Sequence, residues 1–302
     1  MSRVAAAIVL VLGACRQQES KPAYDPAILG RWDTTVQGED SYPMWFEISE
    51  SEIGLKGRLQ ERTGHALDME KVMASGRHLM WTVGETDYHA NLEGATWRGE
   101  GEGKDGRKFE WVGERAPELP ARAEVSWGEP ISLFNGSDLA GWVPRHASEP
   151  NRWKAEAGVL VNEDAGSDLV TEAKFQDFQL HVEVMVPEGS NSGIYLRGRY
   201  EVQVQDDYGK EPHAQRMGGI YGQVTPAENA SLPAGEWQSF DVTLLGRTVT
   251  VVLNGKTIID RKEIPGTTGG ALDSREGEPG PIFLQGDHGR VLYRNLTLTP
   301  AL

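Results

Sequence analysis

Cysteine is almost absent from this chain of 302 residues, because Cys15 is the only one. No intramolecular disulfide can form, so the folded state has to be stabilised by burial of apolar side chains. Hydrophobic residues make up 38% of the sequence, which is enough to build such a core. The length is typical of about two domains.

Basic residues are also scarce. Lysine and arginine together number 30 against 45 aspartates and glutamates, which gives a formal net charge of −15. The basic residues form no clustered segment, and phosphate backbones would be repelled by the acidic chain, so nucleic acid is excluded as a partner. An acidic surface is common among soluble proteins and does not by itself identify a partner.

Long apolar runs are missing except near the start of the chain. Residues 4–12 are apolar, follow Arg3 and run into Leu12-Gly13-Ala14-Cys15. This run is shorter than the ~20 residues that a membrane-spanning helix needs, and the pattern is that of an export signal ending in a lipobox. We therefore expect residues 1–14 to be a signal peptide and Cys15 to carry the lipid, with residues 15–23 as a tether. The protein would then be anchored through lipid to a bacterial membrane, facing the periplasm or the cell surface.

Helical periodicity is rare, and alternation with a period of two replaces it. In residues 24–116, Met44, Phe46 and Ile48 share one face of a predicted strand, and short segments of this kind are separated by turn sequences. This predicts a small antiparallel β-barrel or meander, to which the sequence assigns no role. Two prolines then interrupt the pattern, and residues 117–126 are predicted to be a linker.

The alternation returns in residues 127–302, where Phe178, Leu180, Val182 and Val184 lie on one face of a predicted strand. Two stacked antiparallel sheets would bury one face of each such strand. The fold class is therefore all-β in both regions.

The second region carries a series of short motifs in a fixed order. They are Leu133-Phe134-Asn135-Gly136, Asn191-Ser192-Gly193-Ile194, Tyr200-Glu201-Val202-Gln203, Gly219-Ile220-Tyr221, Ala234-Gly235-Glu236-Trp237, Leu284-Gln285, His288-Gly289 and Tyr293-Arg294-Asn295. Taken together, these motifs resemble the 3-keto-disaccharide hydrolase family. The resemblance implies a concanavalin-like jelly-roll β-sandwich over residues 127–302, with the sugar site on its curved sheet.

Strand parity predicts the position of a site without use of the family. Between residues 194 and 206, the apolar residues Ile194 and Val202 share one face of the predicted strand. The other face carries Tyr195, Arg197, Glu201 and Gln203. This polar face combines a guanidinium, a carboxylate and an amide. Gln203 occupies the middle of the spacing that glucanase jelly rolls use for carboxylates, which argues against a double-displacement glycosidase with two carboxyl groups.

Position along the chain and the motifs predict further residues of the site. Glu183 could reach the same face from another strand, while Asp206 has the wrong parity and would join only through a β-bulge or a turned strand. His288 lies between glycines at a strand end, where a pKa of ~6.5 suits proton transfer. The predicted catalytic residues are Glu201, His288 and Asp206, and the predicted substrate-binding residues are Arg197, Gln203, Glu183, Asn191, Ser192, Gln285 and Tyr221.

The resemblance implies cleavage of an oxidised sugar, a 3-keto glycoside or disaccharide. A ketone at C3 acidifies the proton on C2, so a base can remove it, and the enolate then expels the group on C1 before water adds. Either Glu201 or His288 would transfer protons, with Arg197 and Gln203 holding oxygens of the sugar. Since the sequence has no glycine-rich dinucleotide fingerprint, a separate oxidoreductase would have to oxidise the substrate at C3.

Alternatives remain at the level of the sequence. A lectin-like carbohydrate-binding lipoprotein on the same sandwich would explain the polar strand equally well, and an adhesion or scaffold protein would bind no sugar. No catalytic cofactor is predicted and no metal ligands are assigned, although jelly rolls can hold structural calcium.

Overall fold

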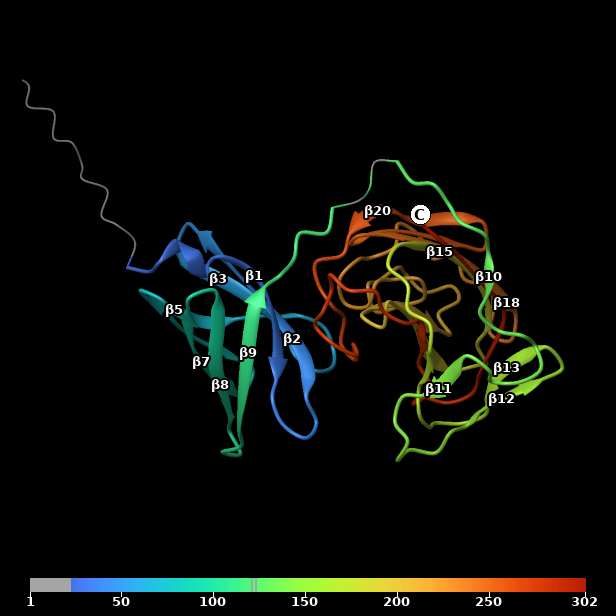
Figure 1. The fold of residues 1–302 in the computed structure, drawn as a ribbon, viewed down its shortest axis with the longest axis horizontal. Helices are drawn as coiled ribbons and strands as arrows, with labels where there is room; N and C mark the ends of the chain where they lie inside the picture. Colours follow the sequence, from blue (N-terminus) through green and yellow to red (C-terminus); the bar gives the residue numbers. More distant parts are fainter. Residues whose placement is uncertain (1–22, 121, 123) are drawn as a thin grey trace, which may run out of the picture.

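The computed structural model describes residues 23–120, 122 and 124–302. The predicted signal peptide and Cys15 lie outside these residues. Within the described ranges, no helix is long and apolar enough to cross a membrane. The chain forms two β units, which lie side by side in Figure 1.

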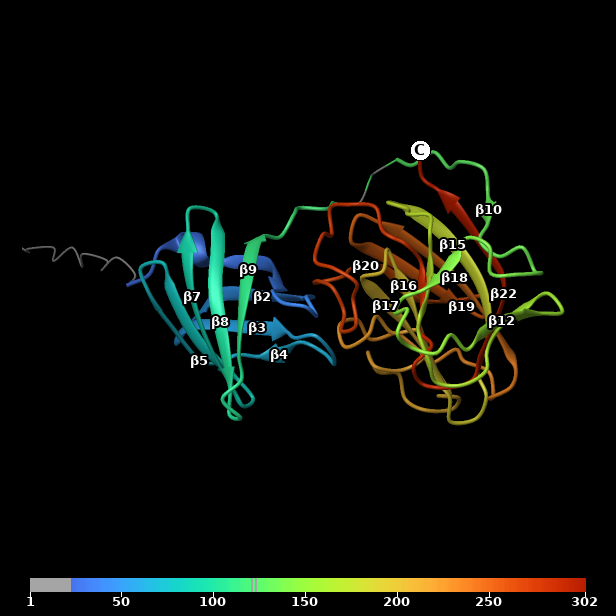
Figure 2. The same cartoon turned by 60° about the horizontal axis from the view of Figure 1, so that its bottom comes forward.

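The first unit is one antiparallel sheet of nine strands that follows a short 3-10 helix, η1 (Pro26–Ile28). Its strands are β1 (Gly30–Val36), β2 (Tyr42–Ser51), β3 (Gly54–Gln60), β4 (Leu67–Asp68), β5 (Glu70–Ser75), β6 (His78–Val83), β7 (Thr86–Glu93), β8 (Thr96–Gly103) and β9 (Lys108–Arg115). Because β1 pairs with both β2 and β9, the meander curls back on itself, as Figures 1 and 2 show. This confirms the prediction of a small antiparallel barrel or meander.

Alternation along the strands explains the core of the first unit. Met44, Phe46 and Ile48 point into it and pack with Trp81, Trp97 and their neighbours. Trp45 has the opposite parity, and it is nevertheless fully buried because the second unit covers it. The outward face of β2 is therefore part of the contact between the two units.

The second unit contains two antiparallel sheets. Its strands are β10 (Ile131–Ser132), β11 (Trp142–Pro144), β12 (Trp153–Glu156), β13 (Val159–Asn162), β14 (Leu169–Thr171), β15 (Phe178–Met185), β16 (Asn191–Leu196), β17 (Tyr200–Gln205), β18 (Trp237–Leu245), β19 (Thr248–Leu253), β20 (Lys256–Glu263), β21 (Phe283–Leu284) and β22 (Val291–Pro300). The larger sheet has the order β12-β13-β22-β15-β18-β19-β20, with β10 beside β22, and the smaller has the order β11-β14-β21-β16-β17. A single apolar core takes side chains from both sheets, which confirms the β-sandwich and its jelly-roll class.

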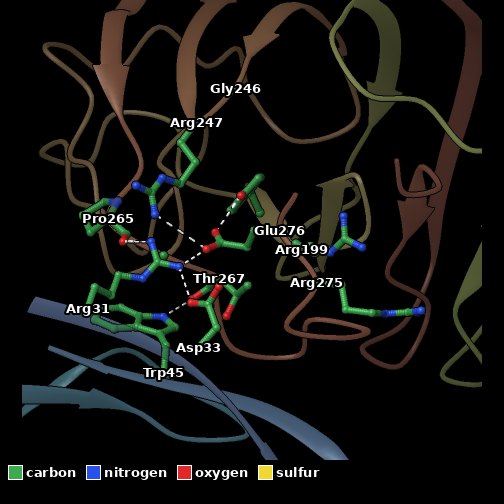
Figure 3. A network of polar contacts seen from close by, with 12 residues as sticks. Arg31, Asp33, Trp45, Arg199, Gly246, Arg247, Pro265, Thr267, Arg275 and Glu276 are labelled. Carbon is green, nitrogen blue, oxygen red and sulfur yellow. Dashed lines mark hydrogen bonds and ion pairs between the residues drawn. The ribbon is translucent and has the colours of Figure 1, made fainter. Parts of the chain in front are cut away.

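A buried cluster of charges, shown in Figure 3, joins the two units. Arg31 of β1 donates hydrogen bonds to Asp33 and to Glu276 of the second unit, and the guanidinium of Arg247 lies 3.6 Å from the Glu276 carboxylate. Tyr200 donates a hydrogen bond of 2.6 Å to the other oxygen of Glu276. Burial lowers the pKa of Arg31 and raises that of Asp33, as expected for charges removed from water.

Trp45 adds a neutral contact beside this cluster. Its indole nitrogen donates a hydrogen bond of 2.7 Å to the carbonyl oxygen of Thr267, and a side chain at Gly266 would collide with the ring. The segment of the second unit that connects β20 to β21 is thus held directly by the first unit.

Candidate active site

A cavity of about 620 Å³ opens between the two units, at the face of the smaller sheet that points away from the core. Its lining from the second unit includes Arg145, His146, Asp168, Asn191, Tyr195, Glu201, Gln203, Tyr221, Phe283, Gln285, Asp287 and His288. Its lining from the first unit includes Tyr42, Arg62, Thr63 and Gly64. The volume falls in the range of ~300–1,000 Å³ that is usual for pockets that bind small molecules.

Glu201 lies on the wall of this cavity, as strand parity predicts. It belongs to β17, whose alternate residues Val202 and Val204 enter the core. Its side chain approaches the backbone of β16 so closely that a side chain at Gly193 would lie 2.4 Å from a carboxylate oxygen. A glycine is therefore required beside it.

Burial changes the acid strength of Glu201. It raises the pKa of this carboxyl group, and the negative charges of Asp287 and Asp168 raise it further by smaller amounts. A hydrogen bond from Tyr195 opposes this rise, and the resulting pKa is about 8. The hydroxyl of Tyr195 lies 2.9 Å from the Glu201 carboxyl group and 2.8 Å from the carbonyl oxygen of Gly269. The single phenolic proton is shared between these two acceptors. Glu201 is mostly protonated near neutrality.

Arg145 and Asp168 form an ion pair on the same wall. Arg145 donates hydrogen bonds to Asp168 at 3.2 Å and to the carbonyl oxygen of Gly270 at 3.0 Å. The backbone N–H of Gly286 donates to the other oxygen of Asp168 at 2.9 Å. Burial raises the pKa of Asp168, and the hydrogen bond from Gly286 and the charge of Arg145 oppose the rise. Arg145 is the cation that this wall of the cavity offers.

Three amides converge on the cavity with oxygens that remain unsatisfied. Asn191, Gln203 and Gln285 line it, and the side-chain oxygen of each is buried and has no hydrogen-bond partner among the described residues. Buried amides normally find partners, so these atoms indicate a polar ligand. A sugar with several hydroxyl donors would fit this set.

The remaining predicted residues of the cavity are Tyr221 and His288. Tyr221 lies 3.4 Å from the side-chain nitrogen of Gln215. His288 has its Nε2 atom 3.5 Å from a carboxylate oxygen of Asp287, and its side chain is 45% exposed. An exposed imidazole beside a carboxylate can accept a proton from a bound ligand.

Arg197 lies away from the cavity, so its predicted place beside Glu201 is wrong. Strand β16 ends at Leu196, and Arg197 begins the turn to β17 with a φ of 52°. This turn breaks the alternation on which the prediction depended. Its buried guanidinium instead donates hydrogen bonds to the carbonyl oxygen of Gly246 at 2.6 Å and to Tyr200 at 3.2 Å.

Glu183 and Asp206 also lie away from the cavity. Glu183 is on β15 of the other sheet, where it accepts hydrogen bonds from Arg294 at 2.6 Å and Asn295 at 2.7 Å. Asp206 follows the last residue of β17 and accepts a hydrogen bond of 3.0 Å from the backbone of Gly189. The pairing of β16 with β17 runs without a register shift, so the bulge that would have aligned Asp206 with Glu201 does not occur.

Ser192 is behind the cavity wall. It belongs to β16 and not to a preceding loop, and its hydroxyl contacts the carbonyl oxygen of Gln285 and the hydroxyl of Tyr293, both at 2.7 Å. A residue in this position can fix the backbone of Gln285, but the interior of the sandwich separates it from a ligand.

Arg145, Asp168 and the role of Tyr195 are not among the residues predicted from the sequence. Tyr195 was on the predicted polar face, and its parity alone could have identified it. Arg145 and Asp168 follow β11 and precede β14, and only the pairing of these strands with each other and with β21 brings them to Glu201. No group of three or more His, Cys, Asp or Glu within the described part of the chain is placed to hold a metal ion.

The site is thus a polar cavity on an all-β sandwich, with a protonated carboxyl group, an ion pair and three unsatisfied amides on its wall. Residues 129–299 match the 3-keto-alpha-glucoside-1,2-lyase-like domain, and the chain belongs to this family. The match covers almost the whole of the second unit. The first unit lies outside the match.

The individual relatives share between 22% and 31% of their residues with this chain. The chain is 22% identical to the 3-keto-disaccharide hydrolase of Bacteroides thetaiotaomicron, over 43% of this chain and 57% of that protein. The match therefore spans little more than half of the relative. A candidate glycosyl hydrolase of Parabacteroides distasonis is 31% identical with a TM-score of 0.49, over 60% of this chain and 93% of that one. A second from the same species is 22% identical with a TM-score of 0.47, over 57% and 93%.

Proposed function

We propose that the cavity binds a 3-keto glycoside and cleaves its glycosidic bond. The main observation behind this proposal is Glu201, which is buried on the wall of a polar cavity. Its carboxyl group has a pKa of about 8 and is therefore protonated at neutral pH. The unsatisfied amide oxygens of Asn191, Gln203 and Gln285 supply acceptors for sugar hydroxyls. Membership of the family supports the oxidised sugar as the substrate class.

The reaction would begin with removal of the proton on C2, which the C3 ketone acidifies. The electron pair of the C2–H bond forms the enolate, which then expels the oxygen on C1 as that oxygen takes up a proton. Water next adds its oxygen to C1 and a proton to C2 of the enone. The net change is hydrolysis with the ketone retained, and it needs a base, an acid and a partner for the enolate oxygen.

The structure suggests a division of these roles. Glu201 is protonated at neutral pH, so it would serve as the acid or as a hydrogen-bond donor to the developing oxyanion. His288, beside Asp287, would be the base. Arg145 would supply the positive charge that the sequence analysis assigned to Arg197, and Gln203 would orient the hydroxyl groups.

The substrate would have to come from another enzyme. Formation of a 3-keto sugar is a dehydrogenation. The pattern G-x-G-x-x-G at residues 101–106 lies in the hairpin between β8 and β9 and opens no helix, so it is no dinucleotide fingerprint that would carry out this step. A separate oxidoreductase acting at C3 is therefore the proposed partner in the reaction sequence.

Substrate selectivity and isotope incorporation test this function together. The protein should cleave a 3-keto disaccharide and leave the parent disaccharide intact, because only the ketone makes the C2 proton acidic. In D₂O, re-addition across the enone should place deuterium at C2 of the released keto sugar, which mass spectrometry and NMR would detect. Cleavage of the parent sugar without deuterium at C2 would indicate an ordinary glycosidase. Binding of the 3-keto sugar without turnover would indicate a lectin.

The position of the protein in the cell is a separate proposal. We infer from the lipobox Leu12-Gly13-Ala14-Cys15 that the mature chain is anchored to a bacterial membrane by lipid on Cys15. In the native host, Cys15→Ser should abolish lipidation and release the protein from the membrane fraction. Mass spectrometry of the mature N-terminus is the measurement. An acyl-free N-terminus in the unaltered protein would contradict the proposal.

A further inference from the structure

We propose that the first unit forms a subsite for the leaving group of the substrate, so that the sugar beyond the scissile bond is held by Tyr42 and Arg62. This inference rests on the proposed function. It assigns a role to residues that the family match does not reach, because the match begins at residue 129. Both side chains line the cavity that contains Glu201.

Tyr42 and Arg62 provide the two features that a sugar ring requires. Tyr42 begins β2 and is half-buried, and the guanidinium of Arg62 lies 5.0 Å from the centre of its ring. An aromatic ring offers apolar surface to the C–H groups of a sugar, and a guanidinium offers several N–H donors to its hydroxyls. Arg62 has an exposed side chain and forms no ion pair among the described residues.

The loop that carries Arg62 is held in shape from inside the first unit. Gln60 is buried, and its side-chain nitrogen donates to the carbonyl oxygens of Glu61 at 3.0 Å and Gly64 at 3.2 Å. Tyr88 donates a hydrogen bond of 2.5 Å to the carboxylate of Glu61. A loop that buried side chains brace in this way is preorganised, which lowers the entropy cost of binding a ligand.

The same loop is docked onto the second unit. The backbone N–H of Gly270 donates a hydrogen bond of 2.9 Å to the carbonyl oxygen of Arg62. A side chain at Gly269 would lie 2.4 Å from the carbonyl oxygen of Gly64, so the two backbones can approach only because Gly269 has none. Residues 61–64 therefore keep a fixed place on the rim of the cavity.

The docking segment of the second unit also touches the reactive groups. The hydroxyl of Thr268 accepts a hydrogen bond of 3.0 Å from the backbone N–H of Glu201, and the carbonyl oxygen of Gly269 accepts one from Tyr195. Arg62 and Glu201 thus both contact the segment Thr268–Gly270, Glu201 through the side chain of Thr268 and Arg62 through the backbone of Gly270. This contact sets the distance between the subsite and the carboxyl group.

The leaving group is the part of the substrate that fits this position. The second unit supplies Glu201, His288 and the unsatisfied amides, so the reacting keto ring would be held there. The cavity volume of about 620 Å³ leaves room for more than one ring. Residues of the first unit would then contact the other half of a disaccharide. The identity of this leaving group could differ between substrates without a change in the reaction at the keto ring.

Two substrates that share the keto ring separate this role from the chemistry. In the full chain, Tyr42→Ala and Arg62→Ala should lower kcat/KM for a 3-keto disaccharide by about 10- to 100-fold, mostly through KM. For methyl 3-keto-glucoside, whose leaving group is methanol, both variants should match the unaltered protein. Tyr42→Phe keeps the aromatic ring, so its kcat/KM for the 3-keto disaccharide should stay close to that of the unaltered protein. Arg98→Ala, on an exposed arginine of the first unit outside the cavity, should change neither substrate.

The outcomes distinguish this inference from the proposed function. Equal losses on both substrates, or no loss on either, would overturn the subsite. If the unaltered protein cleaves neither substrate, the proposed function fails. The subsite is then tested by titration calorimetry, which measures the affinity of each variant for the 3-keto disaccharide and for the methyl glycoside. Weaker binding of the disaccharide alone by Tyr42→Ala would then support it, and unchanged binding would overturn it. Melting temperatures near that of the unaltered protein would show that the variants are folded.

Discussion

Glu201→Gln is expected to lower turnover of a 3-keto glycoside by about 10²- to 10⁴-fold, the usual effect of removing a group that transfers protons. The amide keeps the size of the side chain and can still hydrogen-bond Tyr195, so substrate binding should be largely retained. Steady-state kinetics on the 3-keto disaccharide would measure kcat and KM separately. His288→Ala should cause a loss of similar size if His288 is the base. Turnover of Glu201→Gln within a few-fold of the unaltered protein would contradict the role of Glu201.

The same substitution should change how stability depends on pH. Burial raises the pKa of Glu201 from an ordinary value of 4.5 to about 8 in the folded protein. The folded state therefore holds a proton that the unfolded state has lost, and stability falls as pH rises from about 4.5 to about 8. Its contribution is fully present below the unfolded pKa and is lost above the folded one. The total loss is of the order of 5 kcal/mol for a shift of this size.

Glu201→Gln removes this loss, because the amide does not ionise. The variant should melt close to the unaltered protein at pH 4.5 and at a clearly higher temperature at pH 8.5, as thermal denaturation followed by circular dichroism would show. Glu188→Gln, at an exposed position outside the cavity, should change neither the pH profile nor turnover. A variant that is less stable at every pH would indicate that Glu201 is ionised in the folded protein. A functional group that destabilises its own fold at working pH is common in active sites.

The alternation in the sequence correctly predicts which face a residue lies on wherever the strand is continuous. Between β16 and β17, period-two alternation placed Ile194 and Val202 in the core and Glu201 and Gln203 on the cavity wall. It failed at Arg197, where the chain leaves the strand with a positive φ. Alternation carries no information once a turn begins, so the parity of Arg197 had no structural meaning.

Long-range pairing was the part that the sequence could not supply. Glu183 has the parity of a site residue along its own strand, but β15 belongs to the other sheet. Asp168 reaches the cavity because β14 pairs with β21, more than a hundred residues further along the chain. Tyr42 and Arg62 carry no motif at all. Their place at the cavity depends on how the two units dock, which composition and local pattern do not encode.

The docking itself leads to the second large expected effect, which concerns Glu276. This carboxylate is completely buried between Arg31 of the first unit and Arg247 of the second, as Figure 3 shows. Tyr200 also donates a hydrogen bond to it. Glu276 is the carboxylate that lies within ion-pair distance of both guanidinium groups. Removal of one partner from a buried ion pair leaves an uncompensated charge, which typically costs about 3–5 kcal/mol.

Glu276→Gln should therefore destabilise the protein by about 3–5 kcal/mol, because Arg31 and Arg247 would face each other across the contact with Asp33 and the exposed Glu263 as the remaining carboxylates beside them. Denaturation with urea at neutral pH is the measurement. Glu278→Gln is the matched control, since this glutamate lies two residues away, is 59% exposed and pairs only with Arg275 at 3.3 Å. It should cost less than about 1 kcal/mol, as exposed ion pairs do. Equal effects of the two substitutions would mean that the charges do not hold the units together. A large loss for Glu276→Gln alone would show that the first unit is fixed to the second firmly enough for Tyr42 and Arg62 to keep their place at the cavity.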